Sequence, residues 1–461
     1  MKFSNWIAKT FLISTFCSAV MMSCDSDSDN DIINDDTSVI EGKYIPADST
    51  DLVSTDQMAD SVLTDEAVDL AEDEVLVNGE AVKVDFWIEP EMVYLKASDH
   101  PELNKPGLVM AFRPSESPRG RLVMNGWKGT RDEPITILNK DQVLVASSEQ
   151  GKHALWFTEC EYIRVRGDGN PLYEYGIHIV ESGSSGMSFD QNTTGIEVAY
   201  TEIENTSFAG ILAKTDNASG WVMRDVHLHH NHIHNTHGEG MYIGQTSVDN
   251  AHKIENLYVN HNLIHDTGWD LFQIANVHGD VHIFNNTFVN GGLEEEPMQD
   301  QGFQIGDWSQ ADCYNNIISN TNSRFLFVKG GHDTNIYNNY FSSTKQADAI
   351  FIKTEKKLDP SAELKIHDNW FRDYNRELFW SMVGDHEVII EGNKYSPNND
   401  DSDFIVYSGP ASEENHTVTN NEQMSLPAIE LDEDYNIKSG SYYDGYDLGY
   451  MANESHDKRM Y

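Results

Sequence analysis

The chain has 461 residues and a formal net charge of −45, with 31 Lys and Arg against 76 Asp and Glu. Because nucleic-acid binding depends on clustered Lys and Arg, this balance argues against a nucleic-acid partner. It also disfavours a polyanionic substrate, unless a local basic cleft overrides the overall field. The length fits one to three compact domains, or one longer solenoid of repeats.

The N-terminus has the features of a targeting segment. Lys2 and Lys9 supply positive charge, and residues 6–22 are mostly apolar but too short for a comfortable membrane span. Met-Met-Ser-Cys, ending at Cys24, and the acidic run from Asp25 resemble the signal of a Bacteroidetes surface lipoprotein. The resemblance implies a signal peptide over residues 1–23, lipid chains such as palmitate on Cys24, and anchoring at the outer membrane. An ordinary secretory signal is the alternative.

Composition divides the mature chain into three parts. Residues 24–81 are polar, acidic and poor in aromatic residues, which predicts a disordered tether. From residue 82 apolar and polar residues alternate with period 2, which is typical of strands. We assign residues 82–398 to a repeat domain. Residues 399–461 are again acidic and are expected to form a C-terminal segment that packs on this domain.

The repeat is visible in two neighbouring stretches that align without a gap. Residues 225–245 read DVHLHHNHIHNTHGEGMYIGQ, and residues 256–276 read NLYVNHNLIHDTGWDLFQIAN. One Asn marks almost every turn of the repeat, at intervals of 23–31 residues: Asn231, Asn262, Asn286, Asn316, Asn339, Asn369 and Asn393. A second polar column follows four positions later: Asn205, Asn235, Asp266, Asn290, Asn320, Ser343 and Asp373.

Short strands joined by polar bends at this period predict an all-β fold, a parallel β-helix of about eight or more rungs. The stacked Asn side chains are expected to hydrogen-bond from one rung to the next. The Asn column and the N-x-[Ile/Phe]-x-[Asn/Asp] pattern resemble the right-handed parallel β-helix of the pectin-lyase-like superfamily, over about residues 155–395. That fold hosts hydrolases, lyases and non-catalytic adhesins, so the reaction has to be argued from the site.

Cys160 and Cys313 are the two cysteines that remain after the signal and Cys24. They fall about five rungs apart, or about 24 Å at about 4.8 Å per rung. A disulfide needs Cα atoms within about 7 Å. We therefore predict two free, buried thiols.

Aligning the turns converts the sequence into spatial columns, because matching positions on successive rungs lie about 4.8 Å apart. The column after the second polar position is Ala209, Glu239, Asp270, Gln301, Arg324, Asp348 and Glu377. The outward column of the following strand is Leu212, Tyr242, Gln273, Gln304, Phe327, Phe351 and Trp380. One step past that strand come Gln245, Asn276 and Asp307.

Glu239 and Asp270 are the candidate catalytic pair. Two carboxylates on adjacent rungs repel, which raises the pKa of one of them and suits acid/base cleavage of a glycosidic bond. Their spacing suggests the retaining distance of about 5 Å, and splayed side chains would reach the inverting distance. The motifs Asn235–Gly240 and Gly268–Asp270 distantly resemble those of polygalacturonase-like glycosidases. That family has Asp where His237 stands and a paired Asp-Asp where Asp270 is single.

The columns also predict substrate contacts and weigh against a metal. The residues expected to contact the substrate are His237, Tyr242, Gln273, Gln304, Arg324 and Asp307. His230 is expected to stack on His261, and His234 on His265. Imidazoles with carboxylates can bind zinc, but this spacing matches no zinc signature. No metal is therefore expected, and these histidines are interpreted as bend and surface residues.

The resulting prediction is an extracellular enzyme that cleaves a polysaccharide, with a glycoside hydrolase favoured. The first alternative is a polysaccharide lyase acting on uronic acids, with Arg324, Lys329 or Lys353 as base and calcium as its cofactor. The second alternative is a non-catalytic surface glycan-binding protein that uses an aromatic platform. The sequence indicates neither the sugar nor the oligomeric state.

Overall fold

The computed structural model describes residues 70–214, 221–245, 253–330, 333–345, 348–353, 361–384, 387–399 and 401–452. The chain divides into two units, residues 1–65 and 66–461, and all described residues belong to the second. The predicted signal peptide, Cys24 and the tether up to residue 69 lie outside the described residues.

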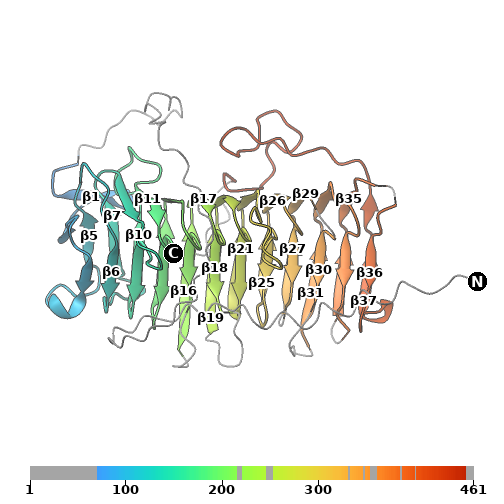
Figure 1. The fold of residues 1–461 in the computed structure, drawn as a ribbon, viewed down its shortest axis with the longest axis horizontal. Helices are drawn as coiled ribbons and strands as arrows, with labels where there is room; N and C mark the ends of the chain where they lie inside the picture. Colours follow the sequence, from blue (N-terminus) through green and yellow to red (C-terminus); the bar gives the residue numbers. More distant parts are fainter. Residues whose placement is uncertain are drawn as a thin grey trace, which may run out of the picture. The chain divides into compact units, whose positions relative to one another are not determined.

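Three long parallel sheets build this unit (Figure 1), and from residue 135 onward the chain passes through them in the same order on each turn. One turn consists of Val222–His229 (β16), His232–Thr236 (β17) and Met241–Gly244 (β18). We call the sheets that contain these strands sheet I, sheet II and sheet III. Each strand pairs in parallel with its equivalents one turn away, so that β16 pairs with Lys253–Asn260 (β19). This is the predicted parallel β-helix.

Among the described residues sheet I has 13 strands: Phe86–Ile88 (β3), Val109–Phe112 (β5), Ile135–Asn139 (β7), Glu161–Arg166 (β10), Thr194–Ala199 (β13), β16, β19, Val277–Phe284 (β22), Ala311–Tyr314 (β25), Thr334–Tyr337 (β28), Glu363–His367 (β31), Glu387–Glu391 (β34) and His416–Thr419 (β37). Sheet II has 11 in the same described ranges: Val143–Ser147 (β8), Ile177–Ser182 (β11), Thr201–Glu204 (β14), β17, Leu263–Thr267 (β20), Thr287–Val289 (β23), Ile317–Thr321 (β26), Tyr340–Thr344 (β29), Trp370–Arg372 (β32), Lys394–Ser396 (β35) and Glu422–Gln423 (β38). Sheet III has 12, counted likewise: Tyr94–Lys96 (β4), Leu122–Asn125 (β6), Leu155–Thr158 (β9), Met187–Asp190 (β12), Ile211–Ala213 (β15), β18, Phe272–Ala275 (β21), Phe303–Ile305 (β24), Leu326–Val328 (β27), Ile350–Ile352 (β30), Phe379–Ser381 (β33) and Ile405–Tyr407 (β36).

The ordered structure extends beyond both predicted limits of the repeat domain. Glu74–Val77 (β1) and Glu80–Lys83 (β2) form an antiparallel hairpin inside the segment predicted as tether. At the other end the sheets continue to β38, past the predicted limit at residue 398. The terminal strands β37 and β38 are largely exposed, which explains why their sequences lack the apolar alternation of the inner turns. Two short 3₁₀ helices, Ala97–Asp99 (η1) and Glu413–Asn415 (η2), complete the elements.

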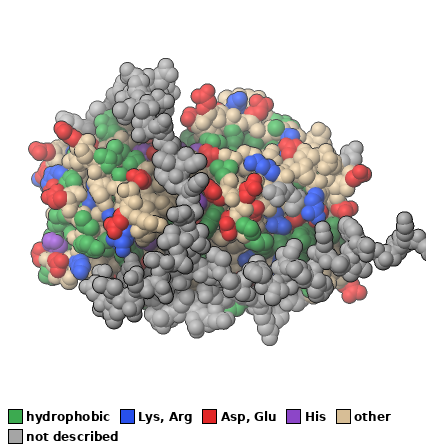
Figure 2. All heavy atoms as spheres, viewed as in Figure 1, with side chains coloured by type: hydrophobic (Ala, Val, Ile, Leu, Met, Phe, Trp, Pro, Cys, Tyr) green, Lys and Arg blue, Asp and Glu red, His purple; other side chains and the backbone are tan. Residues whose placement is uncertain are grey.

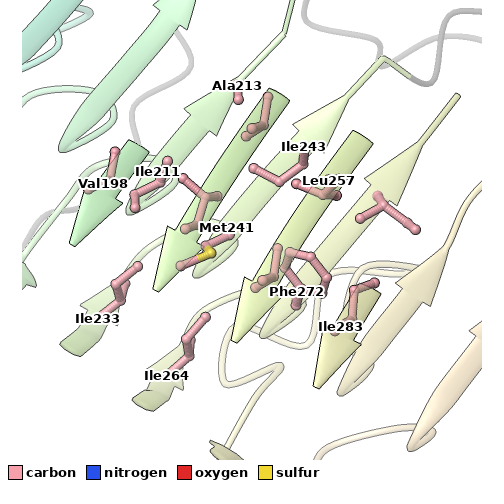
Figure 3. Close-up of a cluster of buried hydrophobic side chains, with 14 of the residues drawn as sticks. Val198, Ile211, Ala213, Ile233, Met241, Ile243, Leu257, Ile264, Phe272 and Ile283 are labelled. Carbon is pink, nitrogen blue, oxygen red and sulfur yellow. The ribbon is translucent and has the colours of Figure 1, made fainter. Parts of the chain in front are cut away.

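Apolar side chains from all three sheets fill the interior of the solenoid (Figure 3). In one turn Leu228 points inward from β16, Ile233 from β17, and Met241 and Ile243 from β18. Each lies over its equivalent in the next turn, as Ile233 does over Ile264. Fully burying one such side chain stabilises the fold by about 1.5–3 kcal/mol. The predicted free thiols are confirmed, because Cys160 and Cys313 are both buried and unpaired.

The predicted Asn column forms a continuous hydrogen-bonded ladder at the bend between sheets I and II. Each Asn donates from its Nδ2 to the Oδ1 of the Asn in the next turn, at 2.9–3.0 Å. The same Oδ1 also accepts the backbone N–H of the previous Asn, at 3.0–3.1 Å. The ladder extends one turn further than predicted, from Asn393 to Asn421.

Both bends that flank sheet II require a left-handed backbone. The residue before each ladder Asn has a positive φ. Examples are His230 (53°) and His261 (52°). The second polar column has it too, with Asn235 at 53° and Asp266 at 55°. Asn and Asp tolerate this conformation better than most residues. The polar columns of the sequence are therefore the corners of the solenoid.

The C-terminal segment packs along the outer face of sheet II. Tyr443 and Leu448 are buried against Ile317 and Tyr340, next to β26 and β29 (Figure 1). The backbone N–H of Tyr450 donates to the hydroxyl of Thr287 at 3.1 Å. Within the described ranges no helix is long and apolar enough to cross a membrane.

Replacement of Asn286 by Ala tests the ladder. The Asn286 side chain donates to Asn316 Oδ1 and to two backbone carbonyls, and it accepts two hydrogen bonds from Asn262. Because the change leaves buried polar groups without partners, we expect a loss of about 3 kcal/mol of unfolding free energy. The measurement is the urea midpoint. The matched control, Asn398→Ala, removes an exposed amide and should stay within about 0.5 kcal/mol of the wild type. Equal effects of the two changes would contradict a stabilising role of the ladder.

Candidate active site

The register of sheet III produces the predicted outward column. Tyr242 lies opposite Gln273, Gln273 opposite Gln304, and Gln304 opposite Phe327. The neighbours of these residues along each strand, such as Met241 and Phe272, point into the core. A hydroxyphenyl ring and two carboxamides therefore line three consecutive turns of one sheet face.

Glu239 and Asp270 precede β18 and β21 in adjacent turns, on the same side as this outward column. Two contacts show that the column of Glu239 and Asp270 lies on this side of sheet III. Ala209, which occupies the position of Glu239 one turn earlier, packs against Tyr242. The guanidinium of Arg324, two turns after Asp270, lies 4.8 Å from the centre of the Phe351 ring. The two predicted columns thus run next to each other.

Both carboxyl groups are withdrawn from solvent, with Glu239 1% and Asp270 0% exposed. Burial raises the pKa of Glu239 to about 7. Burial also raises the pKa of Asp270 well above its usual range, and the charge of Glu239 raises it further. The sequence predicted a raised pKa from repulsion between the two groups, and the structure makes burial the larger cause.

Hydrogen bonds distinguish the two oxygens of Asp270. Its Oδ1 accepts the backbone N–H of Gln301 at 2.9 Å and the Gln301 side-chain Nε2 at 3.3 Å. Its Oδ2 and the Oε2 of Glu239 are buried and accept no hydrogen bond from the described residues. Each carboxyl group thus keeps one buried oxygen that can hold a proton.

His237 lies apart from the carboxyl pair, at an exposed bend. Its side chain is 58% exposed, and its Nδ1 lies 3.7 Å from Glu294 Oε1. Glu294 belongs to an insertion, residues 291–301, that folds against the same bend. The backbone N–H groups of Gly292 and Glu294 donate to Trp269 and Gly268 at 3.0 and 2.9 Å. His237 and the insertion therefore border the site from one side.

Two other predicted contacts are engaged within the protein. Arg324 Nε donates to Asp348 Oδ2 at 2.5 Å, and Asp348 is fully buried. This guanidinium is therefore tied to a buried carboxylate. Asp307, just after β24, lies at the other end of the strand, where its backbone carbonyl accepts the N–H of Asn276 at 2.9 Å.

The sequence analysis missed Lys214, next to the carboxyl pair, and one role of Gln301. Gln301 was placed in the right column, but its two hydrogen bonds to Asp270 were not anticipated. The positive charge of Lys214 acts on Glu239 and lowers its pKa, against the larger effect of burial. Lys214 Nζ also lies 5.9 Å from the centre of the Tyr242 ring. In the strand alignment Ala213 lies opposite Ile243. Extending this alignment by one residue would have placed Lys214 one turn before the carboxyl pair.

The histidine columns lie elsewhere. His230 stacks on His261 at 4.9 Å, and His234 stacks on His265 at 5.1 Å, both as predicted. Glu202, His232 and His234 offer ligand atoms within 4.8 Å of one another, and they belong to sheet II rather than to the face of the carboxyl pair. A hollow of about 620 Å³ on sheet I, lined by Asp280, Lys365 and other polar residues, contains none of the predicted site residues.

Comparison with known families agrees with this architecture. Residues 255–422 match the family model described as "Right handed beta helix region", and residues 117–296 match "Periplasmic copper-binding protein (NosD)". The protein is a right-handed parallel β-helix protein, as the resemblance implied. No curated protein matches the chain significantly.

Solved structures with similar folds include several enzymes. An alginate lyase from Paenibacillus sp. str. FPU-7 is 16% identical, with 72% of this chain and 99% of that chain covered and a TM-score of 0.39. The pectate lyase Pel9A is 10% identical, with coverages of 78% and 91% and a TM-score of 0.44. The GH136 lacto-N-biosidase from Eubacterium ramulus is 12% identical, with coverages of 74% and 68% and a TM-score of 0.41. These identities and scores carry no argument about the reaction.

The buried carboxyl group of Glu239 predicts a specific pH dependence of stability. Because its pKa is raised from 4.5 to about 7 in the folded state, the folded protein binds this proton more tightly than the unfolded chain. This tighter proton binding contributes on the order of 3 kcal/mol to the free energy of unfolding. The contribution is fully present below pH 4.5 and is lost as the pH rises to about 7. Glu239→Gln should remove this loss, so that the variant gains stability over the wild type between pH 4.5 and 8.

The measurement is the urea midpoint of both proteins at intervals across this range. Glu363→Gln, at an exposed position on sheet I, is the matched control and should follow the wild type. A constant difference between Glu239→Gln and the wild type at every pH would contradict the raised pKa.

Proposed function

We propose that this protein cleaves glycosidic bonds of a polysaccharide by hydrolysis, with Glu239 and Asp270 as its catalytic carboxyl groups. The observation that carries the proposal is the pairing of these two groups. They are buried in adjacent turns, both have raised pKa values, and they lie beside the column of Tyr242, Gln273 and Gln304. Hydrolysis of a glycosidic bond requires one protonated carboxyl group and one carboxylate.

The electrostatics favour Asp270 as the acid. Burial raises the pKa of Glu239 to about 7 and that of Asp270 well above its usual range, and the charge of Glu239 raises the pKa of Asp270 further. Two coupled carboxyl groups titrate as a pair, and we assign the proton that the pair holds to Asp270, because an ionised Glu239 stabilises it there. The Oδ1 of Asp270 accepts two hydrogen bonds from Gln301, which leaves Oδ2 to carry the proton. Asp270 would donate it to the leaving oxygen, and Glu239 would act as nucleophile or activate water.

The neighbouring side chains suit a sugar chain that lies along sheet III. Gln273 and Gln304 present carboxamides that can bind hydroxyl groups. Beyond them Phe327 stacks on Phe351 at 4.9 Å, and Phe351 stacks on Trp380 at 4.6 Å. Phe327 and Phe351 are themselves buried, and Trp380 at the end of the stack is partly exposed, so its face can pack against the apolar face of a sugar ring. This part of the site extends over three further turns.

A neutral glycan fits the charges better than a polyanion. Arg324 is paired with Asp348, and the chain carries a net charge of −45. On the face shown in Figure 2, Lys and Arg side chains lie among Asp and Glu side chains. The proposal also includes a location on the bacterial cell surface, with a lipid anchor at Cys24. The Met-Met-Ser-Cys sequence and the acidic residues after it support that location.

The test is turnover on a panel of neutral and acidic polysaccharides, with new reducing ends and ultraviolet absorbance followed together. We expect reducing ends without new absorbance. On the substrate that is cleaved, Glu239→Gln and Asp270→Asn should each lower kcat by at least about 100-fold, because each removes one proton-transfer group. Glu363→Gln is the matched carboxyl control and should keep full activity, and thermal melting verifies that each variant is folded.

Three results would overturn this assignment in whole or in part. Unsaturated, ultraviolet-absorbing products would identify a lyase, and a dependence on added calcium would then be examined. Glycan binding without turnover on every substrate would identify a surface binding protein that uses the aromatic stack of Phe327, Phe351 and Trp380. Wild-type kcat in folded Glu239→Gln or Asp270→Asn would remove that residue from the mechanism.

A further inference from the structure

We propose that the outer face of sheet II binds one divalent transition-metal ion, held by Glu202, His232, His234 and His265. The site does not depend on the proposed hydrolase, because these residues lie on a different sheet from Glu239 and Asp270. It also differs from the sequence prediction that the chain uses no metal. The sequence showed stacked histidines, and the structure adds the carboxylate that they surround.

The register of sheet II brings the ligands into two adjacent columns. In the first column His178 lies opposite Glu202, and Glu202 lies opposite His232. In the second column, two residues further along each strand, Glu204 lies opposite His234, and His234 lies opposite His265. Residues two apart on a strand share one face. Four imidazoles and two carboxylates thus meet on the four consecutive strands β11, β14, β17 and β20.

Three ligand atoms of this group converge on a common point. Glu202, His232 and His234 each offer one atom within 4.8 Å of the others. His234 Nε2 lies 3.2 Å from Glu202 Oε1, and His232 Nδ1 lies 3.8 Å from the same oxygen, close to the separation of about 3.4 Å between ligands of a tetrahedral ion. His265 Nε2 lies on the other side of the His232 ring, 2.8 Å from His232 Nε2, and a rotation of the His232 ring that breaks this contact would admit His265 as the fourth ligand.

Neighbouring residues orient these imidazoles as they do around known metal ions. His265 Nδ1 lies 2.7 Å from Asp266 Oδ2, so that Nδ1 donates its proton and Nε2 presents its lone pair. A carboxylate that accepts from the far nitrogen of a ligating histidine fixes the ring and its tautomer. Asn235 Nδ2 donates to His234 Nδ1 at 3.1 Å, so His234 carries its proton on Nε2, which faces Glu202, and an ion bound there would displace that proton.

The surroundings allow an ion to enter while limiting its contact with water. The side chains of Glu202 and of the four histidines are between 11% and 23% exposed. Tyr175 lies beside His232, with ring centres 5.6 Å apart, and Tyr435 of the C-terminal segment lies 4.6 Å from the His265 ring. Imidazole nitrogens with one carboxylate favour Zn²⁺, Cu²⁺ or Ni²⁺ over Ca²⁺ or Mg²⁺, which prefer oxygen ligands.

The experiment uses the full chain without a polyhistidine tag, freed of metal with a chelator and then exchanged into chelator-free buffer. Zn²⁺ alone is the first probe, with stoichiometry from equilibrium dialysis and elemental analysis and Kd from calorimetry. We expect one Zn²⁺ per chain. His234→Asn and Glu202→Gln should each weaken binding by at least tenfold, and the double variant His232→Asn, His234→Asn should abolish it.

Asp266→Asn is the sharper variant, because it keeps a residue that tolerates the left-handed φ of 55° and removes only the carboxylate behind His265. We expect it to weaken Zn²⁺ binding about 10-fold or more without changing the thermal midpoint of the metal-free protein. The matched control is His367→Asn on sheet I. His367 also contacts a following carboxylate, Asp368, and stacks on a ring, that of Tyr337, but it is no part of the sheet II cluster.

Three results would overturn the site. They are no Zn²⁺ binding by the folded wild type, binding that survives the double variant, and binding that is lost equally in His367→Asn. Replacing Zn²⁺ with Co²⁺ supplies a second readout. Nitrogen ligation would give visible absorption bands in the wild type, and those bands should be lost in the double variant.

Discussion

The hydrogen bonds between the ladder asparagines fix the register on which every other feature of this protein depends. Each Oδ1 accepts two N–H groups from the Asn one turn earlier, so each turn is aligned to its neighbour within the length of a hydrogen bond. A slip of one residue would exchange the inward and outward faces of a strand. With the register fixed at the bend between sheets I and II, side chains more than twenty residues apart lie in straight columns.

These columns explain how a fold whose interior is filled with apolar side chains can assemble chemical groups. The core is filled by Ile233, Met241 and their equivalents, so polar groups can gather only on the outer faces and at the bends. On sheet III this places Glu239 and Asp270 side by side, and on sheet II it places imidazoles around Glu202. Neither cluster is a local sequence motif, because each takes its members from successive turns.

The sequence predicted the features that recur from turn to turn, and it missed the contacts that single side chains make. The Asn column, the polar bends and the adjacency of Glu239 and Asp270 all follow from period and register. The burial of the carboxyl pair and the ion pair of Arg324 with Asp348 depend on how single side chains fold over one another, which spacing does not record. Glu202 was missed for another reason. At its turn Thr201 stands at the position of the ladder Asn and donates to Asn231 Oδ1 through its hydroxyl at 2.8 Å, so the Asn that marks the start of the sheet II strand in later turns is lacking here.

The Thr at position 201 also gives the proposed metal ion a structural role. The ladder of asparagines begins at Asn231. In the turn before it, the hydroxyl and the backbone N–H of Thr201 both donate to Asn231 Oδ1. Glu202, His232 and His265 belong to β14, β17 and β20, which span this junction. An ion held between them would join three turns on the outer face of sheet II, close to the bend where the asparagine ladder starts. Because it would bind the folded arrangement and not the unfolded chain, it would stabilise these turns by mass action, in addition to any chemistry that it supports.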